Sequence, residues 1–211
     1  MPDDRIPNLS VVIVTYNNEL EITACLASAL HAAKDVTCEI IIIDNGSKDG
    51  TRNKIAEVIS NDQKSRVELV VNTQNLGFTK ALNQGLRKSC GEFILALNPD
   101  TTLQPASLTI LMQTLQEDTK TGLIAPQLLN TDGTVQPSCR RFPRRRDVFF
   151  EITGLSLLFP KSRFFNSWKM GDFDHKHRSY VEQPQGACLL FKRQLLTEIG
   201  FWDESFPMFF S

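Results

Sequence analysis

Residues 10–17 read SVVIVTYN, in which a β-branched run from Val11 to Thr15 ends at polar side chains. Residues 39–47 repeat this pattern in EIIIIDNGS, where four isoleucines lead into an acid and a turn. β-Branched side chains favour strands, and a strand that is apolar at every position is typical of a parallel sheet covered on both faces. The two runs therefore predict buried strands of one parallel sheet.

Amphipathic helices are expected after these strands. Between the first two runs, apolar residues recur at helical spacing: Ile22, Cys25, Leu26, Ala29, Leu30 and Ala33. Further strands are predicted over Val67–Val71 and Phe93–Leu97, and each is followed by another helical pattern. This alternation predicts an α/β fold in which helices flank a mostly parallel central sheet.

The alternation becomes irregular after about residue 120. Strands are expected over Leu123–Leu129 and Ala187–Phe191, and a short helix is expected around Leu195–Ile199. No internal repeat or low-complexity linker separates this part from the first. We therefore expect a single domain over residues 1–211.

Composition and charge exclude several classes of protein. The 23 Lys and Arg residues nearly balance the 24 Asp and Glu residues, so the formal net charge is −1 and no nucleic-acid partner is expected. No apolar run approaches the roughly 20 residues of a membrane-spanning helix. The five cysteines include no C-x-x-C pair, which predicts reduced thiols and a cytoplasmic protein.

Polar residues end each of the four predicted strands. They are Thr15-Tyr16-Asn17, Asp44-Asn45-Gly46, Asn75-Leu76-Gly77 and Asn98-Pro99-Asp100. Ligands of open parallel sheets bind at these carboxyl ends, although Asn and Gly also simply form turns. Both interpretations stay open for Asn45-Gly46 and for Asn75 to Gly77. Asp44 and Asp100 indicate a functional site, because a carboxylate next to a buried strand is costly unless it is paired.

A dinucleotide-binding oxidoreductase is the obvious alternative. Its phosphate loop requires G-x-G-x-x-G after the first strand, whereas residues 16–21 read YNNELE. The G-x-x-x-x-G-K-[ST] pattern of P-loop proteins is also missing from the sequence. A nucleotide diphosphate bound here would need another counter-charge, such as Mg²⁺ or Mn²⁺ held by one or two carboxylates. Asp100 is the candidate ligand.

Five blocks, taken in order, resemble glycosyltransferase family 2, and within it the rhamnosyltransferase-like branch. They are residues 12–17 (VIVTYN), 42–47 (IIDNGS), 75–78 (NLGF), 97–100 (LNPD) and the segment from Gln185 to Glu204. The resemblance runs from about residue 9 to the last residue. It implies a Rossmann-like, A-type (GT-A) nucleotide-sugar transferase fold. Residues 9–120 would be the nucleotide-sugar-binding half, and residues 121–211 a partial acceptor-side half.

The resemblance also implies an activity. Members transfer a sugar, with inversion, from a nucleoside-diphosphate sugar to a glycan or lipid-linked acceptor in cell-surface polysaccharide synthesis. The branch favours dTDP-rhamnose as the donor, with a UDP-sugar second. The alternatives are a non-catalytic sugar-nucleotide-binding module or an inactive fragment. A sugar nucleotidyltransferase would carry a Gly-rich, basic loop where this chain has YNNELE.

Residue roles follow by position in the matching motifs. The residues implied to bind the donor are Thr15, Tyr16, Asn17, Asp44, Asn75, Gly77, Asn83 and Asn98. Asp100 matches the last acid of the family's metal-binding D-x-D motif, whose first acid is Asn98 here. Gln185, Gly186 and Ala187 would lie near the sugar and acceptor. The general base of the family would lie in an acidic pair just beyond Ser211, so the chain is expected to end before it.

Arginines are concentrated in residues 140–146, which read RRFPRRR. Such a cluster favours peripheral contact with anionic lipid at the inner face of the cell membrane, or with a lipid-diphosphate acceptor. A solvated, mobile loop is the other interpretation. The following apolar stretch, Val148 to Phe159, is too hydrophobic for a free surface helix. It would dock on the core, on a partner chain or at a membrane.

Overall fold

The computed structural model describes residues 6–62 and 66–206. The chain divides into two compact units, one formed by residues 1–124 with 186–211 and the other by residues 125–185. The predicted second half, residues 121–211, is therefore divided between them. Each unit is described by itself below.

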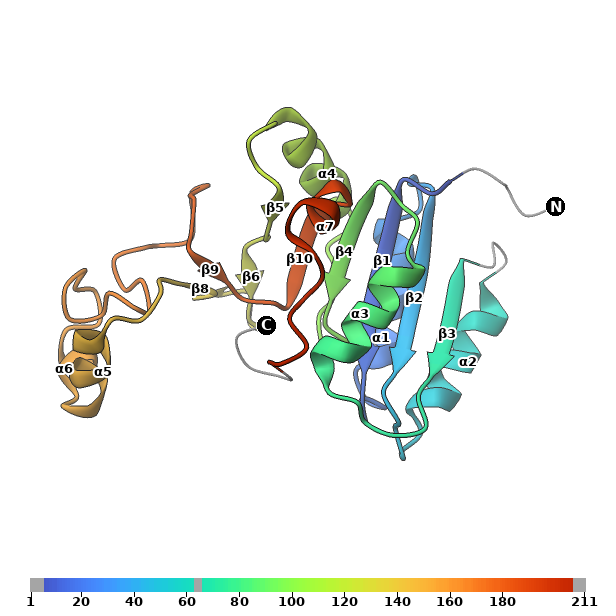
Figure 1. Cartoon of the computed structure of the whole chain (residues 1–211), viewed down its shortest axis with the longest axis horizontal. Coiled ribbons are helices and arrows are strands. Elements are labelled where there is room, and N and C mark those ends of the chain that lie inside the picture. The colour runs from blue at the N-terminus through green and yellow to red at the C-terminus, as the bar shows by residue number, and fades with distance from the viewer. Residues whose placement is uncertain (1–5, 63–65, 207–211) are drawn as a thin grey trace. The chain divides into compact units, whose positions relative to one another are not determined.

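The first unit is built on a six-stranded sheet with the order β3-β2-β1-β4-β10-β5 (Figure 1). The central strands β1 and β2 pair in parallel, and β3 and β4 extend the parallel sheet on either side. β10 runs antiparallel to both of its neighbours. The predicted mostly parallel sheet is thus confirmed. The strands are β1 (Leu9–Thr15), β2 (Cys38–Asp44), β3 (Val67–Val71), β4 (Phe93–Leu97), β5 (Leu123–Ile124) and β10 (Cys188–Lys192).

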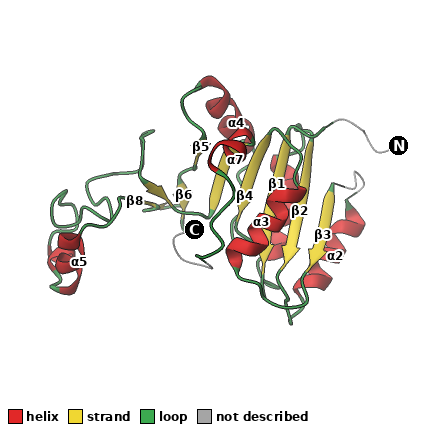
Figure 2. Ribbon diagram, in the orientation of Figure 1, coloured by secondary structure: helices red, strands yellow, loops and turns green. Residues whose placement is uncertain are grey.

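Helices cover both faces of this sheet (Figure 2). Val11 and Ile13 of β1 pack toward α1 (Ile22–Ala32), α2 (Thr51–Asn61) and α4 (Ser107–Glu117). Val12 and Val14 pack on the opposite side with α3 (Phe78–Lys88) and α7 (Gln194–Ile199). Successive side chains of a strand point to opposite faces, so two buried faces require an apolar residue at every position.

The second unit holds two short antiparallel ribbons and two helices. The ribbons pair β6 (Leu128–Leu129) with β7 (Val135–Gln136), and β8 (Cys139–Arg140) with β9 (Gln183–Pro184). The helices are α5 (Arg145–Ile152) and α6 (Leu155–Leu158). No helix within the described ranges has the length and apolar character needed to cross a bilayer.

The strand predicted over Leu123–Leu129 is wrong as one continuous element. It is broken into β5, in the central sheet, and β6, in the second unit. Pro126 lies between them. Proline has no N–H for a sheet ladder, so it interrupts a strand that apolar pattern alone would continue.

Candidate functional site

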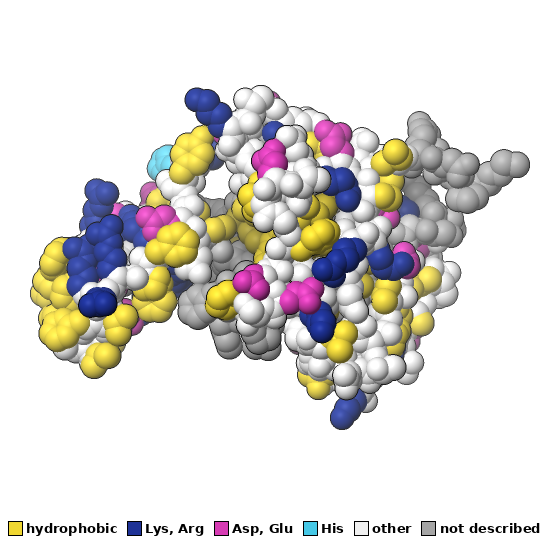
Figure 3. All heavy atoms as spheres, in the orientation of Figure 1, with side chains coloured by type: hydrophobic (Ala, Val, Ile, Leu, Met, Phe, Trp, Pro, Cys, Tyr) yellow, Lys and Arg dark blue, Asp and Glu magenta, His cyan; other side chains and the backbone are white. Residues whose placement is uncertain are grey.

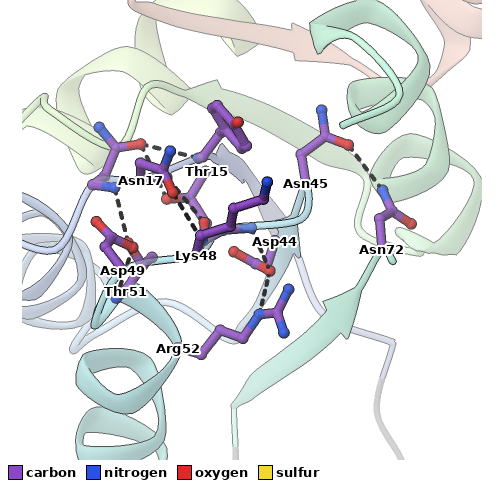
Figure 4. A network of polar contacts seen from close by, with 12 residues as sticks. Thr15, Asn17, Asp44, Asn45, Lys48, Asp49, Thr51, Arg52 and Asn72 are labelled. Carbon is purple, nitrogen blue, oxygen red and sulfur yellow. Dashed lines mark hydrogen bonds and ion pairs between the residues drawn. The ribbon is translucent and has the colours of Figure 1, made fainter. Parts of the chain in front are cut away.

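The loops that follow β1 and β2 are joined by hydrogen bonds at the carboxyl end of the sheet (Figure 4). Asn17 adopts a left-handed backbone conformation, with φ of 57°. Its N–H donates to Ser47 Oγ at 2.9 Å, and its side-chain Oδ1 accepts from the Lys48 N–H at 2.9 Å. The Thr15 hydroxyl donates to Asn18 Oδ1. The end of β1 and the loop after it, which carry the predicted donor-site residues Thr15 and Asn17, are therefore held by hydrogen bonds against the loop after β2.

Asp44, at the end of β2, is fully buried. Its Oδ2 accepts from Arg52 Nε at 2.6 Å and from the Ser47 N–H at 3.2 Å. Its Oδ1 is buried and has no hydrogen-bond partner in the part of the chain that the structure describes. A buried acceptor without a partner costs about 1–3 kcal/mol. Asp44 therefore offers an oxygen that an N–H group of a ligand would satisfy.

Arg52 is a further candidate residue of the site, one that the polar strand ends do not indicate. It lies in the first turn of α2 and forms the ion pair with Asp44. The signal for it was present, because a buried acid implies a nearby cation. Arg52 lies eight positions after Asp44, on the helix that follows the same strand.

Asn45 has a structural role at the next loop. Its Nδ2 donates to Asn75 Oδ1 and to the Gly77 carbonyl, and its Oδ1 accepts from Asn72 Nδ2 and the Leu76 N–H. All four hydrogen-bonding positions of the side chain are thus used within the protein. These contacts agree with the interpretation of Asn45 as a turn residue.

Asn75 and Gly77 lie at the N-terminus of α3. Asn75 has an exposed side chain, and its Oδ1 also accepts from the Gly77 N–H at 2.9 Å. Gly77 precedes the helix with φ of 87°, a conformation that glycine adopts without strain. The N–H groups at a helix N-terminus favour anions. This loop therefore suits the phosphates of a ligand.

Asn98 and Ala187, predicted for the donor and acceptor sides, are brought together. The Asn98 N–H donates to the Ala187 carbonyl at 2.9 Å, because β10 runs antiparallel beside β4.

The Cys25 thiol donates to the Asn98 carbonyl at 3.5 Å. Burial, and secondarily the negative charge of Asp100, raise the pKa of Cys25 to about 12. Gln185 lies in the second unit, where its N–H donates to the Ser138 carbonyl.

Asp100 is the candidate metal ligand. Its carboxylate is exposed, and the Thr101 hydroxyl lies 3.4 Å from Oδ1. Among residues 6–62 and 66–206, no group of three or more His, Cys, Asp or Glu side chains could hold an ion. A lone exposed carboxylate fits Mg²⁺ or Mn²⁺ only where phosphate oxygens and water complete the shell. The residues therefore fit a cation that binds together with a diphosphate.

Asn83, which is predicted to bind the donor, makes hydrogen bonds to the C-terminal segment. It is buried on α3, where its Nδ2 donates to the Trp202 carbonyl at 2.8 Å and to Glu204 Oε1 at 3.0 Å. Its Oδ1 accepts from the Trp202 N–H at 3.2 Å. Both ends of the amide therefore anchor residues 202–204. A donor contact of Asn83 stays a prediction, and residues 207–211, which precede the expected base, lie outside the described residues.

Comparison with protein families gives one match over most of the chain. The model described as "Glycosyl transferase family 2" matches residues 10–178. Curated relatives include the N-acetylglucosaminyl-diphospho-decaprenol L-rhamnosyltransferase of Mycobacterium tuberculosis, which is 27% identical over 95% of this chain and 66% of its own length. The low-salt glycan biosynthesis hexosyltransferase Agl10 of Haloferax volcanii is 24% identical over 97% of this chain and 59% of its own. The chain thus spans less than two thirds of the length of these relatives.

Solved structures show the same fold. The mannosyltransferase PcManGT from Pyrobaculum calidifontis, in complex with GDP-Man and Mn²⁺, aligns with a TM-score of 0.62 and 22% identity over 96% of this chain and 50% of that chain. TarS 1–349 from S. aureus, in complex with UDP, aligns with a TM-score of 0.61 and 20% identity over 94% of this chain and 51% of that chain. The expected GT-A fold is confirmed.

Proposed function

The chain belongs to glycosyl transferase family 2, and on this premise we propose that it transfers a sugar from a nucleoside-diphosphate sugar to a glycan or lipid-linked acceptor. The donor we propose is dTDP-rhamnose or a UDP-sugar, used with inversion in cell-surface polysaccharide synthesis on the cytoplasmic side of the membrane. The names of the rhamnosyltransferase and hexosyltransferase relatives support this class of reaction.

The observation that carries the proposal is the buried, half-satisfied carboxylate of Asp44. Arg52 and the Ser47 N–H bind one oxygen, and the other oxygen has no partner among the described residues. Uracil and thymine each present an imide N–H, which is the donor that such an oxygen requires. Tyr16, next to Thr15 at the end of β1, keeps an exposed ring on which a base can stack.

The diphosphate would lie between the N-terminus of α3 and Asp100. Asn75 and the first backbone N–H groups of α3 would bind phosphate oxygens. Asp100 would hold Mg²⁺ or Mn²⁺, which when bound offsets the charge that develops on a departing diphosphate. The acceptor oxygen would form its bond to the anomeric carbon as the bond to the diphosphate breaks. Its proton would pass to a carboxylate base.

The order of elements supports a shared site for donor and acceptor. Ala187 begins the approach to β10 and accepts a hydrogen bond from Asn98, two residues before the metal candidate. Gly186 and Ala187 therefore lie beside the loop that would carry the cation. Substrate groups bound there would be held next to the reacting carbon, which accelerates transfer by fixing orientation.

Nucleotide binding tests the proposal directly. The thermal unfolding midpoint is measured with dTDP, UDP, GDP and NAD, each with and without Mn²⁺. A ligand present at 100 times its Kd stabilises a protein by about 2.7 kcal/mol. We expect a shift with dTDP or UDP that Mn²⁺ enlarges.

Two variants separate the metal site from the rest of the surface. Asp100→Asn should remove the Mn²⁺-dependent part of the shift and leave a weaker metal-free shift. Asp132→Asn is the matched control, because Asp132 is an exposed acid whose side chain contacts Thr134 in a turn of the second unit. A shift with GDP alone would reject the pyrimidine donor. No shift with any nucleotide would reject the transferase proposal for this chain.

A further inference from the structure

Helices α5 and α6, with the loop after them, expose an unusual number of large apolar side chains. Ile152, Leu157 and Leu158 are 82%, 75% and 71% exposed. The α5–α6 face consists of these three residues with Val148, Phe149 and Phe164. Contiguous exposed apolar groups of this kind mark interaction surfaces.

The sequence of α5 places its apolar side outward. Val148, Phe149 and Ile152 lie at i, i+1 and i+4 on one side of the helix, and all three are exposed, as is Arg145 one turn before Val148. Asp147 and Phe150 are buried on the other side. Asp147 Oδ2 also accepts from the Arg144 N–H at 2.7 Å, which fixes the start of the helix. A surface helix ordinarily buries its apolar stripe, whereas α5 buries Phe150 and exposes its three other apolar side chains.

Contacts within the second unit hold this face in place. The buried ring of Phe150 lies 5.0 Å from the ring of Phe165 and 5.3 Å from that of Phe164. Glu151 accepts from Lys169 Nζ at 2.7 Å, which ties α5 to the chain beyond α6. The apolar side chains are therefore presented by a packed segment.

Exposed basic side chains accompany the apolar residues in this segment. Arg144, Arg145, Lys161 and Arg163 are exposed, and Figure 3 shows Lys and Arg side chains gathered beside hydrophobic ones over α5 and α6. The Arg146 guanidinium lies 5.0 Å from the Phe164 ring centre. The carboxylates of this segment are engaged, Asp147 in the helix start and Glu151 with Lys169. The face is therefore apolar and cationic together.

The contribution of the arginine cluster differs from the sequence-based prediction. Arg140 donates to the carbonyls of Pro137 and Cys139, and Arg141 forms a two-bond pair with Asp172. Arg145 and Arg146 are helical, so the interpretation of residues 140–146 as one solvated loop is wrong. Arg144 and Arg145 are exposed at the start of α5, and Lys161 is exposed further along the chain. Arg163 is exposed as well, and its Nε lies 3.8 Å from Asp172 Oδ2.

We propose that the α5–α6 face docks on the surface of an anionic phospholipid bilayer. The apolar side chains would enter the boundary between headgroups and acyl chains, and the basic side chains would contact lipid phosphates. Charge favours this occupant over a second copy of the chain, because a symmetric dimer through the face would bring like charges together. The proposal does not depend on sugar transfer, since vesicle binding needs no nucleotide.

Sedimentation with vesicles tests the proposal on the full chain. We expect binding to vesicles of phosphatidylcholine mixed with phosphatidylglycerol, weaker binding to phosphatidylcholine alone, and a loss of the difference at high salt. Ile152→Ser with Leu157→Ser and Leu158→Ser should abolish binding to both. Arg144→Gln with Arg145→Gln and Lys161→Gln should weaken binding to the anionic vesicles by about 100-fold.

Matched variants of the first unit are the controls. Leu20→Ser with Ile110→Ser removes apolar side chains that are 89% and 54% exposed, and Lys34→Gln with Lys120→Gln removes exposed charges. Both should bind vesicles as the unchanged chain does. Unchanged binding in the α5–α6 variants, or equal binding to neutral and anionic vesicles, would overturn the proposal. The proposal would also be overturned if the unchanged chain does not bind vesicles but forms a concentration-dependent dimer that the apolar triple variant abolishes.

Discussion

Arg52 Nε lies 2.6 Å from Oδ2 of the buried Asp44 carboxylate, and the other oxygen of Asp44 has no partner among the described residues. The ion pair compensates the burial of the charge but leaves half of the carboxylate unsatisfied. Such an arrangement keeps an acceptor in place before a ligand arrives. This preorganisation lowers the free energy that binding must supply for ordering.

Replacing Asp44 tests this arrangement. Asp44→Asn removes the charge that accepts the ligand N–H, and hydrogen bonds to charged groups contribute about 1.5–3 kcal/mol. We therefore expect the affinity for dTDP or UDP to fall by about tenfold or more, as measured by titration calorimetry.

Asp62→Asn is the control, because Asp62 forms a similarly buried pair with Arg66 at the end of α2, with 3.2 Å between Oδ1 and Nη2. It should lower the free energy of unfolding and leave nucleotide affinity unchanged. Equal loss of affinity in both variants would show that Asp44 acts through stability alone.

Gly46 brings the loop after β2 against the backbone before α3. Its φ is +88°, and a Cβ there would lie 2.8 Å from the Gln74 carbonyl carbon. Gly46→Ala should therefore combine backbone strain of about 1–3 kcal/mol with a backbone clash that displaces Asn75. Gly133→Ala is the control, because Gly133 has φ of +83° and open space around a Cβ. Urea unfolding should give the larger loss for Gly46→Ala, and this variant alone should weaken nucleotide binding. Equal losses of unfolding free energy in the two variants would contradict the predicted clash between Gly46→Ala and the backbone before α3.

The C-terminal segment is held on α3 by Asn83. Asn83→Ala removes three hydrogen bonds to residues 202–204, so we expect a loss of about 1–3 kcal/mol in the free energy of unfolding. Trp202, whose ring lies 5.5 Å from that of Phe191, should become more solvated and its fluorescence should shift to longer wavelength. Asn61→Ala, which removes one bond to the Glu57 carbonyl on exposed α2, should change neither quantity appreciably. An unchanged spectrum in Asn83→Ala would contradict the anchoring role.

Two buried thiols make stability depend on alkaline pH. Burial raises the pKa of Cys25, with a further contribution from Asp100, and burial alone raises that of Cys188, each from an ordinary 9.0 to about 12. Between pH 9 and 12 the folded chain keeps protons that the unfolded chain releases, so stability falls as pH rises, by about 1.4 kcal/mol per pH unit and thiol at most. Urea unfolding at several pH values measures this slope.

The variant Cys25→Ala with Cys188→Ala isolates the thiols from the lysines and tyrosines that titrate in the same range. It should be less stable at pH 7, because buried volume is lost, but its stability should decline less steeply above pH 9. Parallel pH dependences in the variant and the unchanged chain would exclude the thiols as the source.

The parallel sheet was predictable because its signal is local. Residues 11–14 and 40–43 are apolar at every position, as is typical of strands buried on both faces. The helices could be read from the spacing of residues such as Ile22, Cys25 and Leu26 for the same reason. The prediction of one strand over Leu123–Leu129 is wrong, because the apolar pattern does not reveal that Pro126 lacks the N–H that a continuous strand would need.

The sequence also located the candidate site, since polar residues at the ends of parallel strands converge at one edge of the sheet. Only the tertiary structure decided how each of them is used. Asn45 and Asn83 form hydrogen bonds to distant segments, whereas one oxygen of Asp44 has no partner among the residues that the structure describes. Within one arginine cluster, Arg141 pairs with Asp172 and Arg146 lies over the ring of Phe164. Residue type and periodicity are properties of neighbours along the chain, but a side chain's partners depend on which remote segments fold against it.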